Sequence, residues 1–443
     1  MKKTSLESWL FRKMDYEGTP EGAKKYIEAY QLEKLRETIQ LAQQNSIFYR
    51  KHLSKVSLKS MDSFEDFQSI PFTTAGDLQE NPLNFLCVSQ DEIQRIVTLN
   101  TSGTSGASKR IYFTQNDQKL IVDFFAVGMS NLVKGGDRVL ILLPGQQPGS
   151  VGDLLKKALE GIHVKAYIYG FVDDPERIFT LIEEKKINCL VGLPVQVLML
   201  ARCRNKLSTM RKCLLTADYV PEVTKKVLQE NWRCKVFTHY GMTEMGLGGG
   251  VECEALDGYH LREADLYFEV IDPYTGKVVA DGEWGEVVFT TLTREGMPLI
   301  RYRTGDIARF IQEPCPCGSI LKRLDKVMGR WDDLVEIQDG RFLDIGQLDE
   351  VIFGFDEVLD YDVFVDNDNE DMIELHIHIK TKTDHFDVLQ RDVKEALRKI
   401  PVIQKGITSN KMKFPSISKR DTYMKDGRAK RKIKQHTKEG LSI

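Results

Sequence analysis

The run Arg138-Val139-Leu140-Ile141-Leu142-Leu143 is a short apolar segment of the kind that forms a buried strand. Two similar runs follow it, Val164–Tyr169 and Cys189–Val191, and the segments between them, Gly152–Glu160 and Pro175–Lys186, have the pattern of helices. Short apolar strands that alternate with helices of about ten residues indicate βαβ units and a parallel sheet. This stretch therefore predicts an α/β fold.

The same alternation continues on both sides of this stretch. A helix over Asp117–Leu132 is expected before it, and Pro221–Glu230 and Lys235–Phe237 repeat the helix and the strand after it. The first hundred residues predict mostly amphipathic helices. Thr73 or Thr74 is placed to cap one of these helices.

The pattern changes near Asp257. From there to about Ile311, alternating strands are separated by turn signals such as Asp272–Gly276, which predicts an antiparallel or barrel-like part. A third region begins near Trp331 and combines strand-like runs with a helix over Phe386–Ile400.

These patterns together predict an α/β chain with two domains. We expect a large N-terminal domain of parallel α/β sheets over residues 1–330, with a strand-rich, barrel-like part at about 257–330, and a small mobile α+β domain over residues 331–443.

The composition excludes several classes of protein. The 443 residues include 62 Lys and Arg against 65 Asp and Glu, and this balance argues against bulk affinity for nucleic acid or membranes. No apolar run approaches the roughly 18 residues of a membrane-spanning helix, and Met1–Glu7 is not followed by the apolar core of a signal peptide. We therefore expect a cytoplasmic protein without nucleic-acid or membrane partners.

Cysteine usage does not indicate a disulfide scaffold in a chain of this length. Cys189, Cys203, Cys213 and Cys234 lie in or beside apolar runs and are expected to be small buried hydrophobic residues.

The segment Thr101-Ser102-Gly103-Thr104-Ser105-Gly106-Ala107-Ser108-Lys109 follows a β-prone run, Ile96–Leu99. Its glycines let backbone N–H groups approach a ligand, and its hydroxyls and lysine suit phosphate oxygens. The spacing is not that of a Walker loop. The segment predicts a loop that binds a nucleotide triphosphate, and the alternative is a flexible Ser/Gly linker.

A second segment, Thr238-His239-Tyr240-Gly241-Met242-Thr243-Glu244, follows an expected strand. An aromatic ring beside a glycine turn can stack on a base. A carboxylate next to a triphosphate can hold Mg²⁺, which prefers oxygen ligands. We interpret Tyr240 as the stacking ring and Glu244 as the Mg²⁺ ligand, with an ordinary turn and helix cap as the alternative.

Two shorter segments each allow a functional and a purely structural interpretation. In Tyr302-Arg303-Thr304-Gly305-Asp306, the aspartate is placed to accept hydrogen bonds from two ribose hydroxyls, or the segment is a hairpin turn. Gly329-Arg330-Trp331-Asp332-Asp333 lies at the predicted domain boundary and is either a hinge or a plain linker.

The charge distribution is uneven near the C-terminus. Asp360 to Glu374 contains seven acidic residues and no basic one, whereas Lys405 to Ile443 contains twelve Lys and Arg against three Asp and Glu. The basic segment Lys425–Arg431 is suited to meet a developing negative charge. The alternative is a solvated basic terminus.

In this order, the segments resemble the adenylate-forming superfamily, most closely its phenylacetate–CoA ligase family, over nearly all of the chain. The resemblance implies that Tyr240 stacks on adenine, that Glu244 binds Mg²⁺ and that Asp306 holds the ribose. It also implies that Arg330 lies near ribose and phosphate, and that Asp332 is the hinge pivot. Ala217-Asp218-Tyr219 falls where the family has Gly-Ala-Glu, which lines the adenine.

The residues expected at the site fall into two groups. Those implied to bind the nucleotide are Thr101, Ser102, Gly103, Thr104, Ser105, Gly106, Ala217, Asp218, Tyr219, Tyr240, Gly241, Thr243, Asp306 and Arg330. Those implied to assist catalysis are Lys109, Glu244, Arg428 and Lys430.

The resemblance implies a reaction in two steps. A carboxylate attacks the α-phosphate of ATP to give acyl-AMP and pyrophosphate, the C-terminal domain rotates, and the thiol of coenzyme A attacks the acyl group. The chain departs from the family at Gly427-Arg428, where the family has Gly-Lys, and Lys425 and Lys430 lie close enough in sequence to substitute. Two alternatives remain open: transfer to an acyl or aryl carrier protein or another acceptor, and a non-catalytic nucleotide-binding homologue.

The sequence also predicts a metal site. Cys315-Pro316-Cys317-Gly318 is a tight pair of thiols, and Cys253 and His260 form a second pair upstream. Two ligand pairs from separate segments are the usual way to build a structural zinc site, and four protein ligands leave no open position for catalysis. The alternative is a set of free surface thiols on a Pro-Gly turn.

Overall fold

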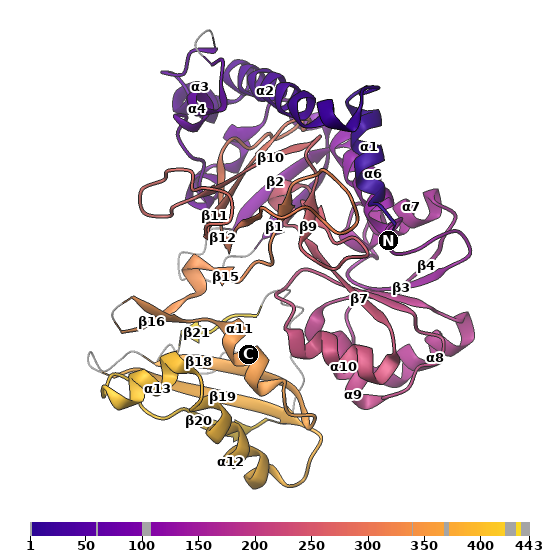
Figure 1. Ribbon diagram of the computed structural model, residues 1–443, viewed down its shortest axis with the longest axis vertical. Coiled ribbons are helices and arrows are strands. Elements are labelled where there is room, and N and C mark those ends of the chain that lie inside the picture. The colour runs from indigo at the N-terminus through magenta and orange to yellow at the C-terminus, as the bar shows by residue number, and fades with distance from the viewer. Residues whose placement is uncertain are drawn as a thin grey trace. The chain divides into compact units, whose positions relative to one another are not determined.

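The computed structural model describes residues 2–58, 61–99, 108–338, 340–366, 372–420 and 431–435. The chain forms two compact units, shown in Figure 1, and each combines two stretches of sequence. The first unit is Met1–Gly170 with Phe237–Val327, and the second is Phe171–Val236 with Met328–Ile443. The predicted division into residues 1–330 and 331–443 stays a prediction.

The N-terminal part of the first unit is helical, as the sequence predicts. Thr4 caps helix α1 (Ser5–Lys13) by accepting a hydrogen bond from the backbone N–H of Leu6. Thr74 caps α5 (Ala75–Glu80) in a capping box with Asp77, which confirms one of the two predicted caps. The described residues of this unit also form α2 (Pro20–Asn45), α3 (Ile47–His52), α4 (Phe64–Gln68), α6 (Gln115–Met129), α7 (Val151–Gly161), η2 (Pro82–Phe85), η3 (Gln90–Glu92) and η4 (Thr243–Met245).

The predicted βαβ pattern is present in the first unit. Strands β3 (Arg138–Leu142) and β4 (Lys165–Ile168) pair in parallel, with α7 between them in sequence. Strands β1 (Ile93–Leu99) and β2 (Lys109–Thr114) pair antiparallel and flank the segment 100–107.

The region after residue 257 is strand-rich, as expected, and its strands pair antiparallel. In one sheet β11 lies between β10 and β12. In another, β9 pairs with β14, and β14 pairs with β13. On its other side β9 pairs with β8, which pairs with β7, and these two strands precede residue 257. Their bounds are β7 (Lys235–Tyr240), β8 (Gly250–Val251), β9 (Tyr259–Leu261), β10 (Leu266–Ile271), β11 (Gly285–Thr291), β12 (Tyr302–Ala308), β13 (Phe310–Ile311) and β14 (Arg323–Leu324).

The second unit begins with another parallel pair. Strands β5 (Cys189–Gly192) and β6 (Lys212–Leu215) are neighbours, and α9 (Pro194–Cys203) connects them. Helices α8 (Pro175–Lys185) and α10 (Glu222–Trp232) flank this pair in sequence. Cys203 is exposed at the last residue of α9, so its expected burial is wrong, whereas Cys189, Cys213 and Cys234 are buried.

The C-terminal part of the second unit is α+β, as predicted. Strand β18 (Val358–Asp366) pairs with β19 (Glu374–Thr381) and β21 (Lys434–Gln435), and β19 pairs with β20 (Ser416–Lys419), as Figure 1 shows. Helix α12 (Phe386–Leu397) buries Leu389, Val393 and Leu397, a spacing of four residues that defines one helix face. The other elements are β15 (Gly329–Arg330), η5 (Trp331–Asp333), β16 (Val335–Gln338), β17 (Arg341–Leu343), α11 (Ile345–Ile352) and α13 (Pro401–Thr408).

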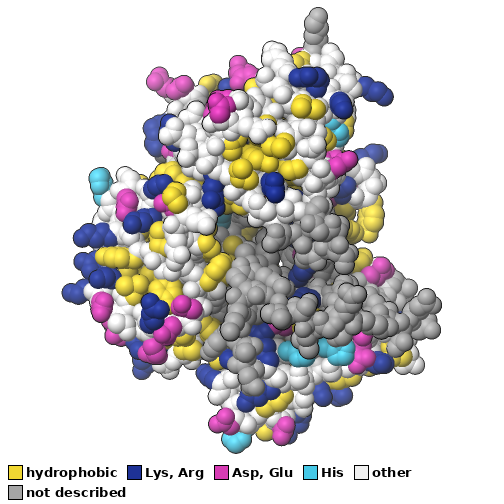
Figure 2. Space-filling view, turned by 180° about the vertical axis from the view of Figure 1, so that it is seen from behind, with side chains coloured by type: hydrophobic (Ala, Val, Ile, Leu, Met, Phe, Trp, Pro, Cys, Tyr) yellow, Lys and Arg dark blue, Asp and Glu magenta, His cyan; other side chains and the backbone are white. Residues whose placement is uncertain are grey.

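The surface agrees with the balanced composition. Figure 2 shows Lys and Arg side chains interspersed with Asp and Glu over the described part of one face. Among the described residues, no helix has both the length and the apolar character to cross a membrane.

Candidate functional site

Two residues predicted to assist catalysis, Lys109 and Glu244, form an ion pair in the first unit. Lys109 begins β2, and Glu244 lies in η4, just after β7. The Nζ of Lys109 donates to Oε1 of Glu244 at 2.5 Å, and the hydroxyl oxygen of Tyr302 lies 3.4 Å from both atoms. The side chains of Lys109 and Glu244 are 12% and 3% exposed. Because a buried carboxylate needs a partner, Lys109 supplies the charge that Glu244 requires.

The turn that carries Glu244 is fixed by close packing. A Cβ atom on Gly241 would lie 2.5 Å from the carbonyl oxygen of Leu247, so a residue with a side chain cannot occupy this position without a shift of the backbone. Arg294 donates from Nη1 to the carbonyl oxygen of Glu244 at 2.8 Å and from Nη2 to that of Tyr112 at 2.9 Å. Arg294 therefore joins the Glu244 turn to the strand that begins at Lys109.

Arg294 was not identified from the sequence. It follows β11 and belongs to none of the predicted motifs. Its two hydrogen bonds go to backbone carbonyl groups, which carry no signal in the sequence.

The predicted motif Tyr302–Asp306 lies beside the motif Thr238–Glu244. The hydroxyl of Tyr240 donates to Oδ2 of Asp306 at 3.0 Å, and the backbone N–H of Asp306 donates to Oγ1 of Thr304. Tyr240 and Asp306 are 6% and 4% exposed. Thr243 opens the turn η4, where its carbonyl oxygen accepts from the N–H of Gly246. The structure thus brings together residues from three segments that are distant in sequence.

Several predicted residues lie elsewhere. Thr101, Ser102, Gly103, Thr104, Ser105, Gly106, Arg428 and Lys430 fall outside the described residues. Ala217, Asp218, Tyr219, Arg330 and Asp332 belong to the second unit, with Arg330 in β15 and Asp332 in η5. Their predicted roles toward a nucleotide stay predictions.

The Ala217–Tyr219 segment has an unusual backbone. Ala217 has a φ of 69°, in the left-handed region that residues with a side chain seldom adopt. Such positions persist only where the surroundings determine them, and they are frequent in binding loops. Asp218 accepts hydrogen bonds from the backbone N–H groups of Tyr219 and Arg431, and burial raises the pKa of Asp218 to about 7.

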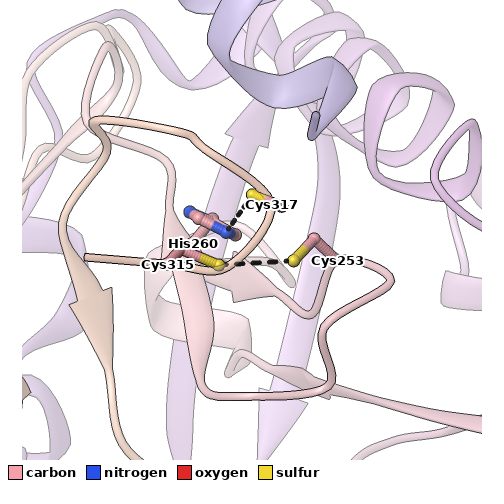
Figure 3. A group of neighbouring side chains, drawn as sticks. All are labelled: Cys253, His260, Cys315 and Cys317. Carbon is pink, nitrogen blue, oxygen red and sulfur yellow. Dashed lines mark hydrogen bonds between the residues drawn. The ribbon is translucent and has the colours of Figure 1, made fainter. Parts of the chain in front are cut away.

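The four predicted metal ligands converge in the first unit. Figure 3 shows Cys253, His260, Cys315 and Cys317 with their side chains directed toward one another. Their ligand atoms all lie within 4.8 Å of one another, and the four residues are at most 6% exposed. The alternative of free surface thiols is therefore wrong, because the thiols are buried.

The spacing of these atoms suits a tetrahedral ion. The two Sγ atoms of Cys253 and Cys315 are 3.6 Å apart, and Sγ of Cys317 is 3.5 Å from Nε2 of His260. Tetrahedral ligands at the usual Zn–S and Zn–N distances are separated by about 3.5 to 3.8 Å. These residues therefore fit one zinc ion.

The protonation states are consistent with a site for a cation. Burial, assisted by Arg323, lowers the pKa of His260 to about 4, so its imidazole is neutral, the form that binds metals. Burial raises the pKa of the Cys253 thiol to about 12, so this cysteine becomes a thiolate only if a cation compensates its charge. Among the described residues, Nδ1 of His260 has no hydrogen-bond partner.

The N-terminal helix contacts the loop after Cys317. Oε2 of Glu7 accepts hydrogen bonds from the Ser319 hydroxyl at 2.6 Å and from the Ile320 N–H at 2.9 Å. The sequence did not predict this contact, because Glu7 and Ser319 are 312 positions apart.

Known proteins resemble this chain over most of its length. It is 27% identical over 428 residues to the phenylacetate-coenzyme A ligase of Thermus thermophilus, which covers 91% of this chain and 94% of that protein. It is 28% identical over 389 residues to the phenylacetate-coenzyme A ligase of Pseudomonas putida, covering 82% and 84%.

Solved structures and a family comparison complete the assignment. A 2-hydroxyisobutyryl-CoA ligase in its postadenylation state superposes with a TM-score of 0.75 at 20% identity, covering 93% of this chain and 89% of the other, which confirms the mixed α/β fold. The sequence model of the AMP-binding enzyme family matches residues 31–292. Because this match extends over more than half of the chain, the protein belongs to the AMP-binding enzyme family.

Proposed function

We propose that this protein is an ATP-dependent acid–CoA ligase. In the first step, an oxygen of the substrate carboxylate forms a bond to the α-phosphorus of ATP, and pyrophosphate leaves. In the second step, the sulfur of coenzyme A forms a bond to the acyl carbon, AMP leaves and the thiol proton passes to solvent. The observation that carries this proposal is the meeting of Lys109, Glu244 and Tyr302 in a member of the AMP-binding enzyme family.

The residues at this meeting point have the chemistry that the first step needs. Phosphoryl-type transfer depends on positioning and on neutralising charge more than on covalent help from the protein. Lys109 is suited to bind phosphate oxygens, and Glu244 offers the oxygen ligand that Mg²⁺ prefers. When bound, Mg²⁺ would neutralise charge on the phosphates. The ammonium of Lys109 has three N–H donors, so it can bind phosphate oxygens while one donor stays on Glu244.

The remaining assignments follow the same scheme. We propose that Tyr240 stacks on the adenine, with Ala217, Asp218 and Tyr219 beside it, and that Asp306 holds the ribose near Arg330. The hydrogen bond from Tyr240 to Asp306 supports placing Tyr240 at the adenine and Asp306 at the ribose, because base and ribose are adjacent in a nucleotide. The Thr101–Gly106 loop, Gly241, Thr243, Arg428 and Lys430 complete the proposed site around the phosphates.

The names of the relatives guide the choice of acid. Two relatives are named phenylacetate-coenzyme A ligases. We therefore propose a modest aromatic or aliphatic carboxylate as the substrate, and coenzyme A as the acceptor.

The experiment measures pyrophosphate release from ATP and Mg²⁺ with a panel of aromatic and aliphatic acids, followed by thioester formation. Lys109→Met is expected to abolish release, whereas Lys119→Met, which changes an exposed lysine paired with Asn116, is the matched control. Coenzyme A and a phosphopantetheinylated carrier protein are compared as acceptors. Loading of the carrier alone would replace the proposed acceptor, and no release from any acid while ATP still binds would contradict the ligase activity.

We also propose that Cys253, His260, Cys315 and Cys317 bind one structural Zn²⁺. The sulfur and nitrogen donor set, the separations of 3.6 and 3.5 Å and the burial of all four residues support this. Elemental analysis of the purified protein should find one zinc per chain. Cys317→Ser should lose it, whereas Cys203→Ser, which changes an exposed cysteine outside the cluster, should keep it. Full zinc content in Cys317→Ser would contradict the assignment.

A further inference from the structure

Glu244 is held both at its side chain and at its backbone. The carboxylate contacts Nζ of Lys109 at 2.5 Å and the hydroxyl of Tyr302 at 3.4 Å, and the backbone carbonyl oxygen accepts from Nη1 of Arg294 at 2.8 Å. In the proposed function Lys109 also binds phosphate oxygens, so its donors are shared once a nucleotide is present. The hydrogen bond from Arg294 reaches the backbone, so it is the same with and without a nucleotide.

The second arm of the same guanidinium binds the strand that carries Lys109. Nη2 of Arg294 donates to the carbonyl oxygen of Tyr112 at 2.9 Å, and Tyr112 lies three residues after Lys109 on β2. The guanidinium is planar and its donors form a rigid fork, so the separation of the two carbonyl oxygens is fixed. Arg294 therefore sets how far the backbone of the Glu244 turn lies from β2.

Arg294 itself is held firmly in place. It is 7% exposed, and its guanidinium carbon lies 4.5 Å from the ring centroid of Phe113. On one side the hydroxyl of Thr293 donates to Oδ1 of Asp265 at 2.7 Å. On the other side the carboxylate of Asp117 accepts from the N–H groups of the two residues after Arg294, at 3.1 and 3.3 Å. The segment around Arg294 is thus tied to the rest of the unit on both sides.

This arrangement has the form of the support behind a metal ligand. Mg²⁺ demands nearly ideal octahedral geometry and is bound through one or two carboxylates together with phosphates, so the place of each carboxylate matters. Residues that orient a metal ligand typically change metal affinity by about 10- to 100-fold when they are replaced. Arg294 stands in this relation to Glu244, the proposed Mg²⁺ ligand.

We propose that Arg294 is a positioning residue, which holds Glu244 at the place from which its carboxylate binds the Mg²⁺ of the bound nucleotide. This inference rests on the proposed function. In this scheme Arg294 touches neither the metal nor the nucleotide and acts through Glu244. Replacing it therefore weakens metal binding and leaves the metal-independent part of nucleotide binding as it is.

The test measures metal binding directly on the full-length protein, with Mn²⁺ as the probe because it shares the oxygen ligands of Mg²⁺. Electron paramagnetic resonance follows a Mn²⁺ titration in the presence of α,β-methylene ATP, and gives both the number of sites and their dissociation constant. Arg294→Lys keeps the charge but loses the fork, so the dissociation constant should rise by about tenfold or more. The number of sites per folded chain should stay the same.

Two further measurements separate positioning from general damage. The affinity for α,β-methylene ATP in the presence of a chelator should be unchanged in Arg294→Lys. Exchange of labelled pyrophosphate into ATP should need a higher Mg²⁺ concentration for its half-maximal rate, whereas the rate at saturating Mg²⁺ should change much less.

Two other variants complete the design. Arg36→Lys is the matched control, because Arg36 lies in the same unit and its Nε also donates to a backbone carbonyl, that of Met61 at 2.6 Å, outside the predicted motifs. It should leave the dissociation constant for Mn²⁺ unchanged. Thr293→Val keeps Arg294 but removes the bond to Asp265, so it should raise that constant in the same direction by a smaller factor. It carries the test if Arg294→Lys does not fold.

The outcomes are distinguishable. An unchanged dissociation constant in folded Arg294→Lys, or an equal loss of nucleotide affinity without metal, would overturn the role of Arg294. A wild-type protein that binds Mn²⁺ with the analogue but releases pyrophosphate with no acid would overturn the ligase activity and leave this role standing. A wild-type protein that binds the analogue without any Mn²⁺ would overturn the proposed Mg²⁺ site and this inference with it.

Discussion

The Nζ of Lys109 lies 2.5 Å from Oε1 of Glu244, and solvent reaches little of either side chain. Each group is a close counter-charge of the other, so a change at one removes an ion-pair partner from a buried group at the other. The pair also joins the end of the predicted phosphate loop to the predicted Mg²⁺ ligand. Stability and nucleotide binding are therefore coupled at this contact.

The first prediction concerns this pair. Lys109→Met should lower the free energy of unfolding by about 3 kcal/mol, because the buried Glu244 carboxylate loses its ion pair with Lys109. Adding Glu244→Gln should restore part of that stability without restoring adenylation. Urea denaturation and pyrophosphate release measure the two effects. A double variant as unstable as the sum of the two single variants would show that the residues are not coupled.

The second prediction concerns Gly241. Gly241→Ala places a Cβ 2.5 Å from the carbonyl oxygen of Leu247, so the turn before Glu244 has to move. We expect a loss of about 1 to 3 kcal/mol in unfolding free energy and weaker nucleotide binding.

Gly161 is the control for this change. It ends helix α7, and a Cβ there meets nothing within 4 Å. Gly161→Ala should leave stability unchanged or raise it by up to about 1 kcal/mol. Calorimetry of nucleotide binding completes the comparison, and equal behaviour of the two alanine variants would refute the steric argument.

The third prediction is a pH dependence of stability. Burial raises the pKa of Glu263 from 4.5 to about 7, although its carboxylate accepts a hydrogen bond from the Lys322 N–H. Between pH 4.5 and 7 the folded state therefore holds a proton that the unfolded state has released, so stability from this group falls as pH rises through that range. The loss amounts to about 3 kcal/mol at pH 7 and above.

Glu263→Gln should remove this dependence. Its unfolding free energy should exceed that of the wild-type protein at pH 8, and the two should converge near pH 4. Glu160→Gln, at an exposed position, should leave the pH profile unchanged. A wild-type stability that rises steadily from pH 4.5 to 7 with the same slope in Glu263→Gln would show that this carboxyl is not responsible.

The fourth prediction concerns removal of the proposed zinc. His260 lies on β9, which pairs with β8, and β8 pairs with the end of β7 that carries Tyr240. Chelation should therefore lower the melting temperature and also weaken nucleotide binding. Thermal scans before and after verified loss of zinc test this, with zinc added back as the control. An unchanged melting temperature after complete removal would assign the cluster no structural role.

Much of the fold and of the candidate site is predictable from sequence. Apolar runs such as Arg138–Leu143 predict buried strands because a parallel sheet that is covered on both faces hides such a run. The three motifs at Lys109, Tyr240–Glu244 and Tyr302–Asp306 were predicted separately, and the structure shows their side chains in contact.

The features that sequence reasoning missed have physical reasons. Helix α9 is apolar along nearly its whole length, so it shows no amphipathic period. Arg294 binds carbonyl groups, and Glu7 binds a loop near the other end of its unit. Sequence reasoning did not connect the acidic and basic stretches near the C-terminus, but Asp360 and Asp362 of the first pair with Arg420 of the second.

The contact between Glu7 and Ser319 has a consequence for how the chain matures. A ribosome adds about 5 to 20 residues per second. Ser319 is therefore synthesised roughly 15 to 60 seconds after Glu7, because the two residues are 312 positions apart. Helix α1 can rest on α6 much earlier, through Trp9 and Asp123. The contact between helix α1 and the loop after Cys317 can therefore form only late in synthesis, after the residues of α6 have been available for some time.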